Sequence, residues 1–314
     1  MATYVGILPH ELVDSISTAQ QQSGSSTRLL RLPHPRTSIP SLFAAYASGI
    51  HVAEVQSVAP ANERSWFIGD SVVADGRLLI MTPMDPTFLL IPLLAAIQPV
   101  RGSPARLRPW DDIAEDIVAK VTTDTAAPPK DRSTIVEAAD LTAFLDTACC
   151  RAALRNICQC EDITPEITVY RYSSDRLNEY LQRKVARLSA SPLQEGSRTM
   201  TRNLARDGLM EDGKEELLKL GRIRAACDLV SQYLPRDVHT TLKASYDFSA
   251  LDAHLKSLQP SEVSIGQDAS KEKDSMPAKE ATKKRKGKGS QGVEKLKKAN
   301  TEGMAKLSTF FKKK

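Results

Sequence analysis

Long hydrophobic runs are missing from this chain of 314 residues. Its most apolar stretch, FLLIPLLAAI at 88–97, is about half as long as the ~20 residues that cross a bilayer, and it contains Pro92. The first residues, MATYVGILPHELVDS, have neither the basic start nor the apolar stretch of a secretory signal peptide. We therefore expect a soluble intracellular protein.

Catalytic motifs are also missing. The chain has no GxSxG or HExxH motif and no glycine-rich phosphate-binding loop. Its five histidines are scattered: His10, His34, His51, His239 and His254. One group of acids could hold a divalent ion: Asp111, Asp112, Glu115 and Asp116. These residues fall at the start of a predicted helix, where negative charge complements the helix dipole, and this favours a structural role. We expect a chain that is not itself an enzyme and that holds no metal or cofactor.

Cysteine is scarce, with five residues in the chain. They are too few and too clustered for a disulfide framework, which points to a reducing compartment. The first four have the spacing CC-x7-CxC, without the paired CxxC of a zinc ribbon, and the residues between them read as helix. We expect free thiols, buried or partly exposed, rather than a metal site, at Cys149, Cys150, Cys158, Cys160 and Cys227.

Aromatic residues make up 5% of the chain, and none lies between Phe248 and Phe310. Residues 271–314 contain fifteen basic and five acidic residues, which leaves a net charge of −5 on residues 1–270. A segment of this composition buries too little apolar surface to offset the entropy of ordering. We therefore expect a disordered basic tail over 249–314, and a folded body that does not coat nucleic acid over its whole surface.

The body divides by pattern into a strand-rich part, residues 1–98, and a mainly helical part, residues 99–248. Short runs rich in β-branched and large apolar residues predict strands at TYVGIL, TRLLRL, GIHVAEVQSV, RSWFIGD and GRLLIM. Asp75-Gly76 is typical of a hairpin turn. Asp85 and Pro86 predict the start of a helix that runs to about Ile97 and that Pro92 should kink.

In the helical part, apolar spacing predicts helices over 110–121, 134–146, 149–159, 174–188 and 215–234, with a shorter one reaching about Phe248. VYRYS at 169–173 reads as a strand, and 191–213 reads as a loop. Five residues of the 174–188 helix form one apolar stripe: Leu177, Tyr180, Leu181, Val185 and Leu188. The predicted fold class is therefore α+β.

Three stretches together resemble the family of non-catalytic B subunits of eukaryotic type 2 ribonuclease H: 64–94, 167–188 and 222–246. The SWFI element followed by TPMDPTFLL is the specific part of the match. The resemblance implies that the N-terminal strands interleave with the C subunit in a shared β-barrel, that the pair docks the catalytic A subunit, and that the helical middle is winged-helix-like. Mg²⁺ and the catalytic carboxylates would belong to the A subunit.

Two sets of residues then become candidates for contacts. Trp66, Phe67 and Phe88 are either interface anchors or core residues of this chain. A basic set on the strand and helix at 169–188 is either a nucleic-acid surface or a solvated helix face: Arg171, Arg176, Arg183, Lys184 and Arg187.

The family ends in a peptide that binds the sliding clamp, proliferating cell nuclear antigen, with the pattern Q-x-x-h-x-x-a-a. The matching positions here are Met304, Leu307, Phe310 and Phe311, and Met304 departs from the pattern because it lacks the glutamine amide. KKRKGK at 283–288 has the charge density of a nuclear-import signal, although it could instead attract nucleic acid nonspecifically: Lys283, Lys284, Arg285 and Lys286.

We therefore expect a nuclear accessory subunit of a heterotrimeric complex that degrades the RNA of RNA/DNA hybrids and incises at single ribonucleotides in duplex DNA. The alternative is a DNA-binding regulator that uses the winged helix.

Overall fold

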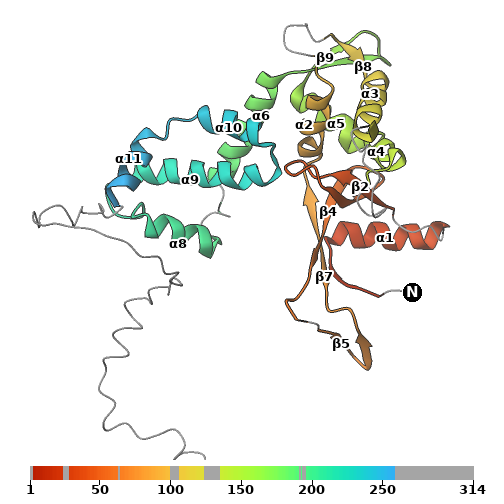
Figure 1. Cartoon of the computed structure of the whole chain (residues 1–314), viewed down its shortest axis with the longest axis horizontal. Helices are drawn as coiled ribbons and strands as arrows, with labels where there is room; N and C mark the ends of the chain where they lie inside the picture. The colour runs from red at the N-terminus through yellow and green to blue at the C-terminus, as the bar shows by residue number, and fades with distance from the viewer. Residues whose placement is uncertain are drawn as a thin grey trace, which may run out of the picture. The chain divides into compact units, whose positions relative to one another are not determined.

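The computed structural model describes residues 3–23, 28–62, 64–99, 106–123, 135–190, 192 and 196–258 (Figure 1). All of them belong to one compact unit, Met1–Pro260. The predicted tail beyond 258, with its clamp-binding and import residues, lies outside the described residues. Among the residues described, no helix is long and apolar enough to span a membrane.

A five-stranded sheet forms the N-terminal part of this unit. Its order is β1-β7-β4-β3-β2, so that β1 and β2 are the edges. β1 runs parallel to β7, and the other neighbours pair antiparallel. The strands are β1 (Val5–Ile7), β2 (Leu29–Pro33), β3 (Pro40–Tyr46), β4 (His51–Val58) and β7 (Leu78–Met84). The sequence pattern missed β3, which begins at a proline and contains two alanines.

A second, two-stranded sheet is the hairpin of β5 (Trp66–Ile68) and β6 (Ser71–Val73). Its turn is at Gly69, which has a φ of +56°. The hairpin prediction at Asp75-Gly76 was therefore wrong. β7 pairs with β1 and β4 rather than with β6, so Asp75-Gly76 joins two separate sheets.

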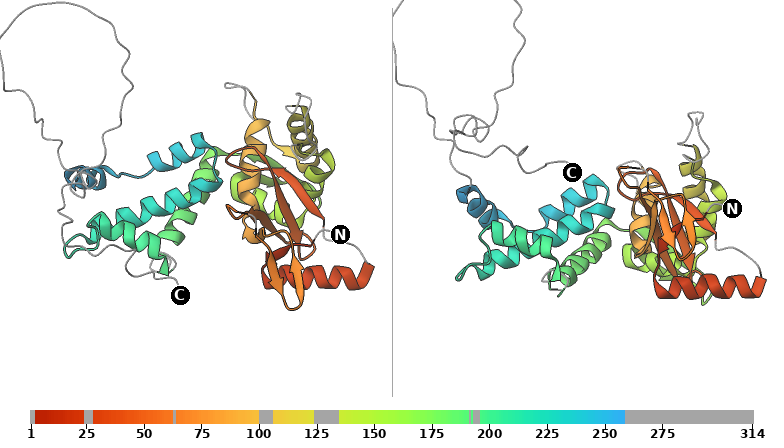
Figure 2. Two further views of the ribbon diagram at one scale, coloured as in Figure 1. Left: turned by 60° about the horizontal axis from the view of Figure 1, so that its bottom comes forward. Right: turned by 90° about the horizontal axis from the view of Figure 1, so that it is seen from below.

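Each face of the larger sheet packs against its own helix. Successive residues of a strand point to opposite faces of the sheet. Val52 of β4 belongs to the core that contains α2 (Pro86–Ala96). Its neighbour Ala53 packs on the other face, against Leu12 of α1 (His10–Ser23). Figure 2 shows α1, in red, beside the strands. α1 has no clear apolar stripe in the sequence, because its polar residues outnumber its apolar ones, and it was not predicted.

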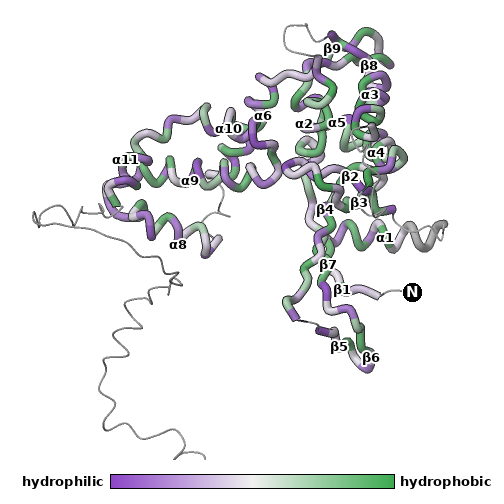
Figure 3. Tube along the Cα trace, in the orientation of Figure 1, coloured by the Kyte–Doolittle hydropathy of each residue, from purple (hydrophilic) through white to green (hydrophobic). Residues whose placement is uncertain are grey.

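Helix α2 begins as predicted. Asp85 is the N-cap and accepts a hydrogen bond from the Thr87 amide at 3.0 Å, and Pro86 occupies the first helical position. The helix is apolar along nearly its whole length (Figure 3), and most of its side chains are buried. α2 is therefore the central element on which the sheet and the following helices pack.

Helices and a small sheet follow in the order of a winged helix. The elements are β8 (Arg108–Pro109), α3 (Trp110–Thr123), α4 (Ala138–Leu145), α5 (Ala148–Ile157), β9 (Cys158–Asp162) and β10 (Thr168–Tyr172). β10 lies between β8 and β9 and pairs antiparallel with both. The helical interpretation of residues 158–159 was wrong, because pairing with β10 makes CQCED a strand. The five cysteines are free thiols, of which only Cys160 is not buried.

The C-terminal helices pack on α6 and α9. They are α6 (Ser174–Ser189), α8 (Arg198–Arg206), α9 (Glu215–Val230), the 3₁₀ turn η2 (Ser231–Tyr233), α10 (Arg236–Ala244) and α11 (Ser249–Leu258). The N-cap of α6 is Ser173, which agrees with the helix predicted over 174–188. The expected loop at 191–213 contains α8.

Helix α11 occupies residues that we had assigned to the tail. Leu251 is buried in a small cluster with Leu204 and Leu209. Arg224 of α9 donates to Asp252 at 2.5 Å and lies over the ring of Phe248, 4.9 Å from its centre. These contacts hold α11 against the body, so the expected start of the tail at residue 249 was wrong.

One hydrophobic core crosses the expected boundary at 98/99. It contains Phe43 of the sheet, Phe88 of α2 and Phe144 of α4. A buried carboxylate, Glu54 of β4, accepts a hydrogen bond from the Tyr233 hydroxyl at 2.8 Å. Burial and this bond raise the pKa of Tyr233 to about 12. Sheet and helices therefore form a single packed body.

Candidate functional site

Exposed apolar side chains gather on the hairpin and the strands that carry it. Phe67 is 80% exposed, and Val72, which lies directly across the hairpin from it, is 61% exposed. Further exposed apolar side chains lie beside them on β5 and at the ends of β1 and β4: Ile68, Tyr4, Ile7 and Val58. An apolar surface of this kind next to an edge strand is typical of an interface with another chain.

The base of the hairpin is held in a defined position. The Trp66 indole N–H donates to the carbonyl of Arg77 at 3.2 Å, and the Ser65 hydroxyl donates to the carbonyl of Ala74 at 3.4 Å. Gly76 passes so close to the preceding loop that a Cβ there would overlap the carbonyl oxygen of Arg64. The hairpin is therefore fixed at its base while its apolar face stays exposed.

A surface ion pair closes the same loop. Arg77 and Asp75 pair at 2.5 Å, and the Asp75 carboxylate also accepts from the Arg77 amide at 3.0 Å. These hydrogen bonds from Arg77 lower the pKa of Asp75.

The structure separates the three interface candidates. Phe67 is exposed, and Trp66 is half-buried with its indole N–H bonded within the chain. Phe88 is buried in the core, with its ring 5.9 Å from that of Tyr233. Of the three, Phe88 has a packing role, and Phe67 is the side chain that a partner could contact.

The basic candidates of β10 and α6 also differ from one another. Arg171 donates to the Gln159 side-chain oxygen at 2.8 Å, and the ring of Tyr180 lies 5.9 Å from the guanidinium of Arg183. Arg176 and Arg187 are exposed. These four remain at the surface, where nucleic acid could reach them.

Lys184 has a structural role instead. Its ammonium pairs with Asp85, the N-cap of α2, and the Tyr180 hydroxyl donates to the same carboxylate. Burial acts to raise the pKa of Asp85, but hydrogen bonds from Lys184, Tyr180 and the Thr87 amide outweigh it and hold the pKa below its usual value. The same pairing overcomes burial and raises the pKa of Lys184. The prediction that Lys184 contacts nucleic acid does not fit this arrangement.

We predict that Lys184→Met destabilises the protein by about 2 kcal/mol at neutral pH, less than the ~3–5 kcal/mol for a fully buried pair, because this one is partly exposed. The folded state lowers the pKa of Asp85, so this carboxylate stabilises the fold at every pH above 3.8, the ordinary pKa of Asp. That stabilisation is lost as the pH falls below 3.8 and through the lowered pKa. Urea unfolding at pH 7 and pH 3 should therefore show a difference between variant and wild type that shrinks at pH 3.

The matched control is Lys219→Met on α9. Lys219 pairs with Glu216 at 3.1 Å, but both side chains are exposed, so its loss should cost less than about 0.5 kcal/mol. An equal loss of stability at both pH values in Lys184→Met would show that packing, not charge, is responsible.

The acids of α3 do not converge with other ligating side chains. Asp116 pairs with Arg108 at 2.6 Å, and Asp111 and Asp112 lie in the first turn. No group of three or more His, Cys, Asp or Glu side chains in the described part of the chain is arranged to hold a metal ion.

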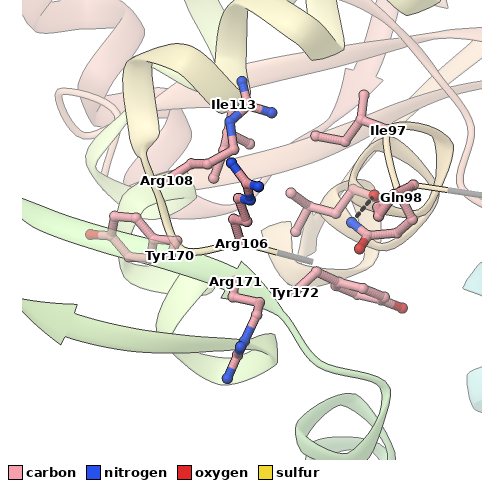
Figure 4. Close-up of a pocket in the computed structure, with 10 residues that line it drawn as sticks. Ile97, Gln98, Arg106, Arg108, Ile113, Tyr170, Arg171 and Tyr172 are labelled. Carbon is pink, nitrogen blue, oxygen red and sulfur yellow. Dashed lines mark hydrogen bonds between the residues drawn. The ribbon is translucent and has the colours of Figure 1, made fainter. Parts of the chain in front are cut away.

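Sequence reasoning missed the cavity at the end of α2. Arg106, Arg108 and Arg171 line it together with apolar side chains (Figure 4). Arg171 was identified for its charge. Its closeness to Arg106 depends on the pairing of β8 with β10, which a local sequence pattern does not reveal.

Comparisons with known proteins are consistent along the chain. Residues 7–85 match the profile of the Ydr279p protein triple barrel domain, and residues 88–243 match the winged helix-turn-helix domain of the Ydr279p protein family, described as an RNase H2 complex component. The ribonuclease H2 B subunit of Xenopus tropicalis is 25% identical over 95% of this chain and 90% of its own length. The protein of the same name from Schizosaccharomyces pombe is 25% identical over 93% of this chain and 97% of its own, and that from Mus musculus is 25% identical over 76% and 68%.

Proposed function

This chain belongs to the Ydr279p family of ribonuclease H2 complex components, and we propose that it acts there by scaffolding the catalytic A subunit together with the C subunit and by tethering the complex to the sliding clamp. The complex would degrade the RNA of RNA/DNA hybrids and incise at single ribonucleotides in duplex DNA. The predicted accessory role in a ribonuclease H2 complex is confirmed by the family, and its details are the proposal.

The exposed apolar hairpin carries this proposal. Phe67, Ile68 and Val72 lie on a two-stranded sheet, and an isolated hairpin of that size is marginal in water. β1 offers a further free edge beside β7. Strands of a C subunit that paired here would cover the apolar face and remove the edge.

Hydrolysis itself would be performed by the partner. Two-metal hydrolysis needs converging carboxylates that hold Mg²⁺, and we assign these to the A subunit. This chain would contribute position: its packed body, with one core from sheet to helices, would hold the surfaces that contact the A and C subunits in a fixed arrangement. No cofactor is proposed for this chain.

Reconstitution tests the proposal. The full chain, co-expressed with the A and C subunits, should elute with them as one species and should cleave an RNA/DNA hybrid only when the A subunit is present. Cleavage by this chain alone in Mg²⁺, or its elution apart from the other subunits, would contradict the proposal.

We predict that the C-terminal peptide 300–314 binds the sliding clamp. Leu307, Phe310 and Phe311 can converge on one side of a single helical turn and bury apolar surface worth roughly 7–10 kcal/mol, of which ordering the peptide costs about 2–5 kcal/mol. Affinity should be micromolar or weaker because Met304 lacks an amide. Calorimetry with the clamp should show binding that Phe310→Ala plus Phe311→Ala abolishes. Equal binding by both peptides would refute the assignment.

The localisation is proposed to be nuclear. Lys283, Lys284, Arg285 and Lys286 have the charge density that import receptors recognise. A reporter fused to residues 278–292 should accumulate in nuclei, and it should stay in the cytoplasm when the four residues are replaced by Ala.

A DNA-binding role of the winged helix is the second candidate. Arg171 on β10 and Arg176 at the start of α6 are exposed. If they contact phosphates, the full chain should bind duplex DNA with an affinity that falls steeply with salt. Salt-independent binding, or none, would exclude this role.

A further inference from the structure

A cavity of about 280 Å³ opens at the C-terminal end of α2. Its apolar lining comes from three elements: Leu94 of α2, Ile113 of α3 and Tyr170 of β10, together with Ile97 just beyond α2. The Gln98 side chain is fixed on one side by its hydrogen bond to the Leu94 carbonyl at 2.7 Å (Figure 4). A volume of this size accommodates one large apolar side chain.

Arginines surround this cavity. Figure 4 shows Arg106 between Arg108 and Arg171. Arg108 is neutralised by Asp116, at 2.6 Å, and Arg171 donates to the amide oxygen of Gln159. Arg106 is exposed and has no carboxylate partner within the described ranges. The opening of the cavity is therefore positive, whereas its floor is apolar.

The depth of the cavity disfavours a nucleic-acid duplex at this place. Asp111, Asp112 and Glu115 of α3 are not among the residues that line it, although Ile113 of the same helix is. A rigid duplex could reach the arginines at the opening, but it cannot place apolar groups on the floor of such a cavity. A flexible peptide can do so, with acidic residues directed at the arginines.

We propose that this cavity is a docking site for an acidic peptide segment of a partner protein, with one large apolar side chain inserted on Leu94 and Ile113 and the flanking carboxylates on Arg106 and Arg171. Apolar burial would supply affinity, and the arginines would select acidic over neutral or basic segments. The site is separate from the exposed hairpin, so it can be occupied while the hairpin pairs with another chain.

The test uses the full chain and a fluorescein-labelled peptide with three aspartates on each side of one phenylalanine. Fluorescence anisotropy should detect saturable binding. Replacing the phenylalanine with serine should weaken binding about tenfold or more, because the burial of one aromatic side chain is lost. Replacing the aspartates with asparagine should weaken it to a similar extent and remove its dependence on salt.

Two variants locate the binding. Arg106→Glu reverses an exposed charge and should weaken binding about tenfold. Gln98→Trp fills the cavity without changing charge and should also weaken binding, with melting followed by circular dichroism to confirm that the fold is kept. Arg151→Glu, the same reversal at an exposed position of α5, is the matched control and should bind normally.

Three results would overturn the proposal: equal binding of the serine peptide, equal weakening in Arg151→Glu, or full binding in Arg106→Glu. A 20-base-pair duplex that displaces the probe from the wild type but not from Gln98→Trp would show that the cavity serves nucleic acid instead. Because none of these measurements involves the other subunits, the result is independent of the proposed assembly.

Discussion

Replacing Phe67 and Val72 together with Asp should reduce recovery of the partner subunits by about 30-fold or more, since a single interface hot spot is typically worth at least ~2 kcal/mol. The two side chains face each other across the hairpin, and both are largely exposed in the free chain. A strand that pairs with the hairpin would have to bury the new carboxylates without partners. Quantitative recovery of the A and C subunits on the tagged, co-expressed full chain measures the effect.

The control for this experiment is Ile163→Asp. Ile163 lies in the loop between β9 and β10 and is 58% exposed, so it matches the hairpin residues in apolar exposure but belongs to a different surface. Neither this variant nor the hairpin double variant should lower the melting temperature of the isolated chain. Normal recovery of partners by the double variant would place the subunit interface elsewhere on the molecule.

Phe144→Ala should cost more stability than Lys184→Met, with a loss of about 3–5 kcal/mol. The ring of Phe144 is fully buried between the winged helix and the sheet, and its removal leaves a cavity that a packed core cannot close. At about 2–4 °C per kcal/mol for a body of this size, the melting temperature should fall by roughly 10 °C. Phe67→Ala, at an exposed position, should leave it unchanged.

The same experiment tests whether the body unfolds as one unit. Trp110 is buried in the core, and in a Trp66→Phe background it is the single tryptophan, so its fluorescence reports on the helical part alone. Circular dichroism reports on the whole body. The two melting curves should coincide, because one core joins the sheet and the helices. Two separate transitions would restore the division into independent domains at 98/99.

Local patterns predicted the elements whose causes are local. The start of α2 follows from Asp85 and Pro86, and the apolar stripe of α6 is buried as its spacing indicates except at Leu188, which is partly buried. The pattern failed where a distant partner decides. CQCED lacks β-branched residues and becomes a strand because β10 pairs with it, and the hairpin forms at Gly69 rather than at Asp75-Gly76 because β7 pairs with β4.

The candidate site shows the same limit. Charge along α6 made Lys184 equivalent to Arg183, but only the fold shows that Asp85, far away in the sequence, binds the lysine. The sequence likewise could not tell that Phe67 is exposed and Phe88 is buried, since the exposure of a side chain depends on how the whole chain packs around it. The resemblance of SWFI and TPMDPTFLL identified the family, whereas the role of each side chain required the structure.

The bond between Glu54 and Tyr233 has a consequence for synthesis of the chain. A ribosome that adds about 5–20 residues per second reaches Tyr233 roughly 10–40 s after Glu54. Until then the carboxylate lacks its hydrogen bond from the phenol, and His34, whose Nε2 lies 3.7 Å from Glu54, is the nearby group already synthesised. The shared core, which includes Val230, Leu234 and Leu242, therefore cannot be complete before that interval has passed.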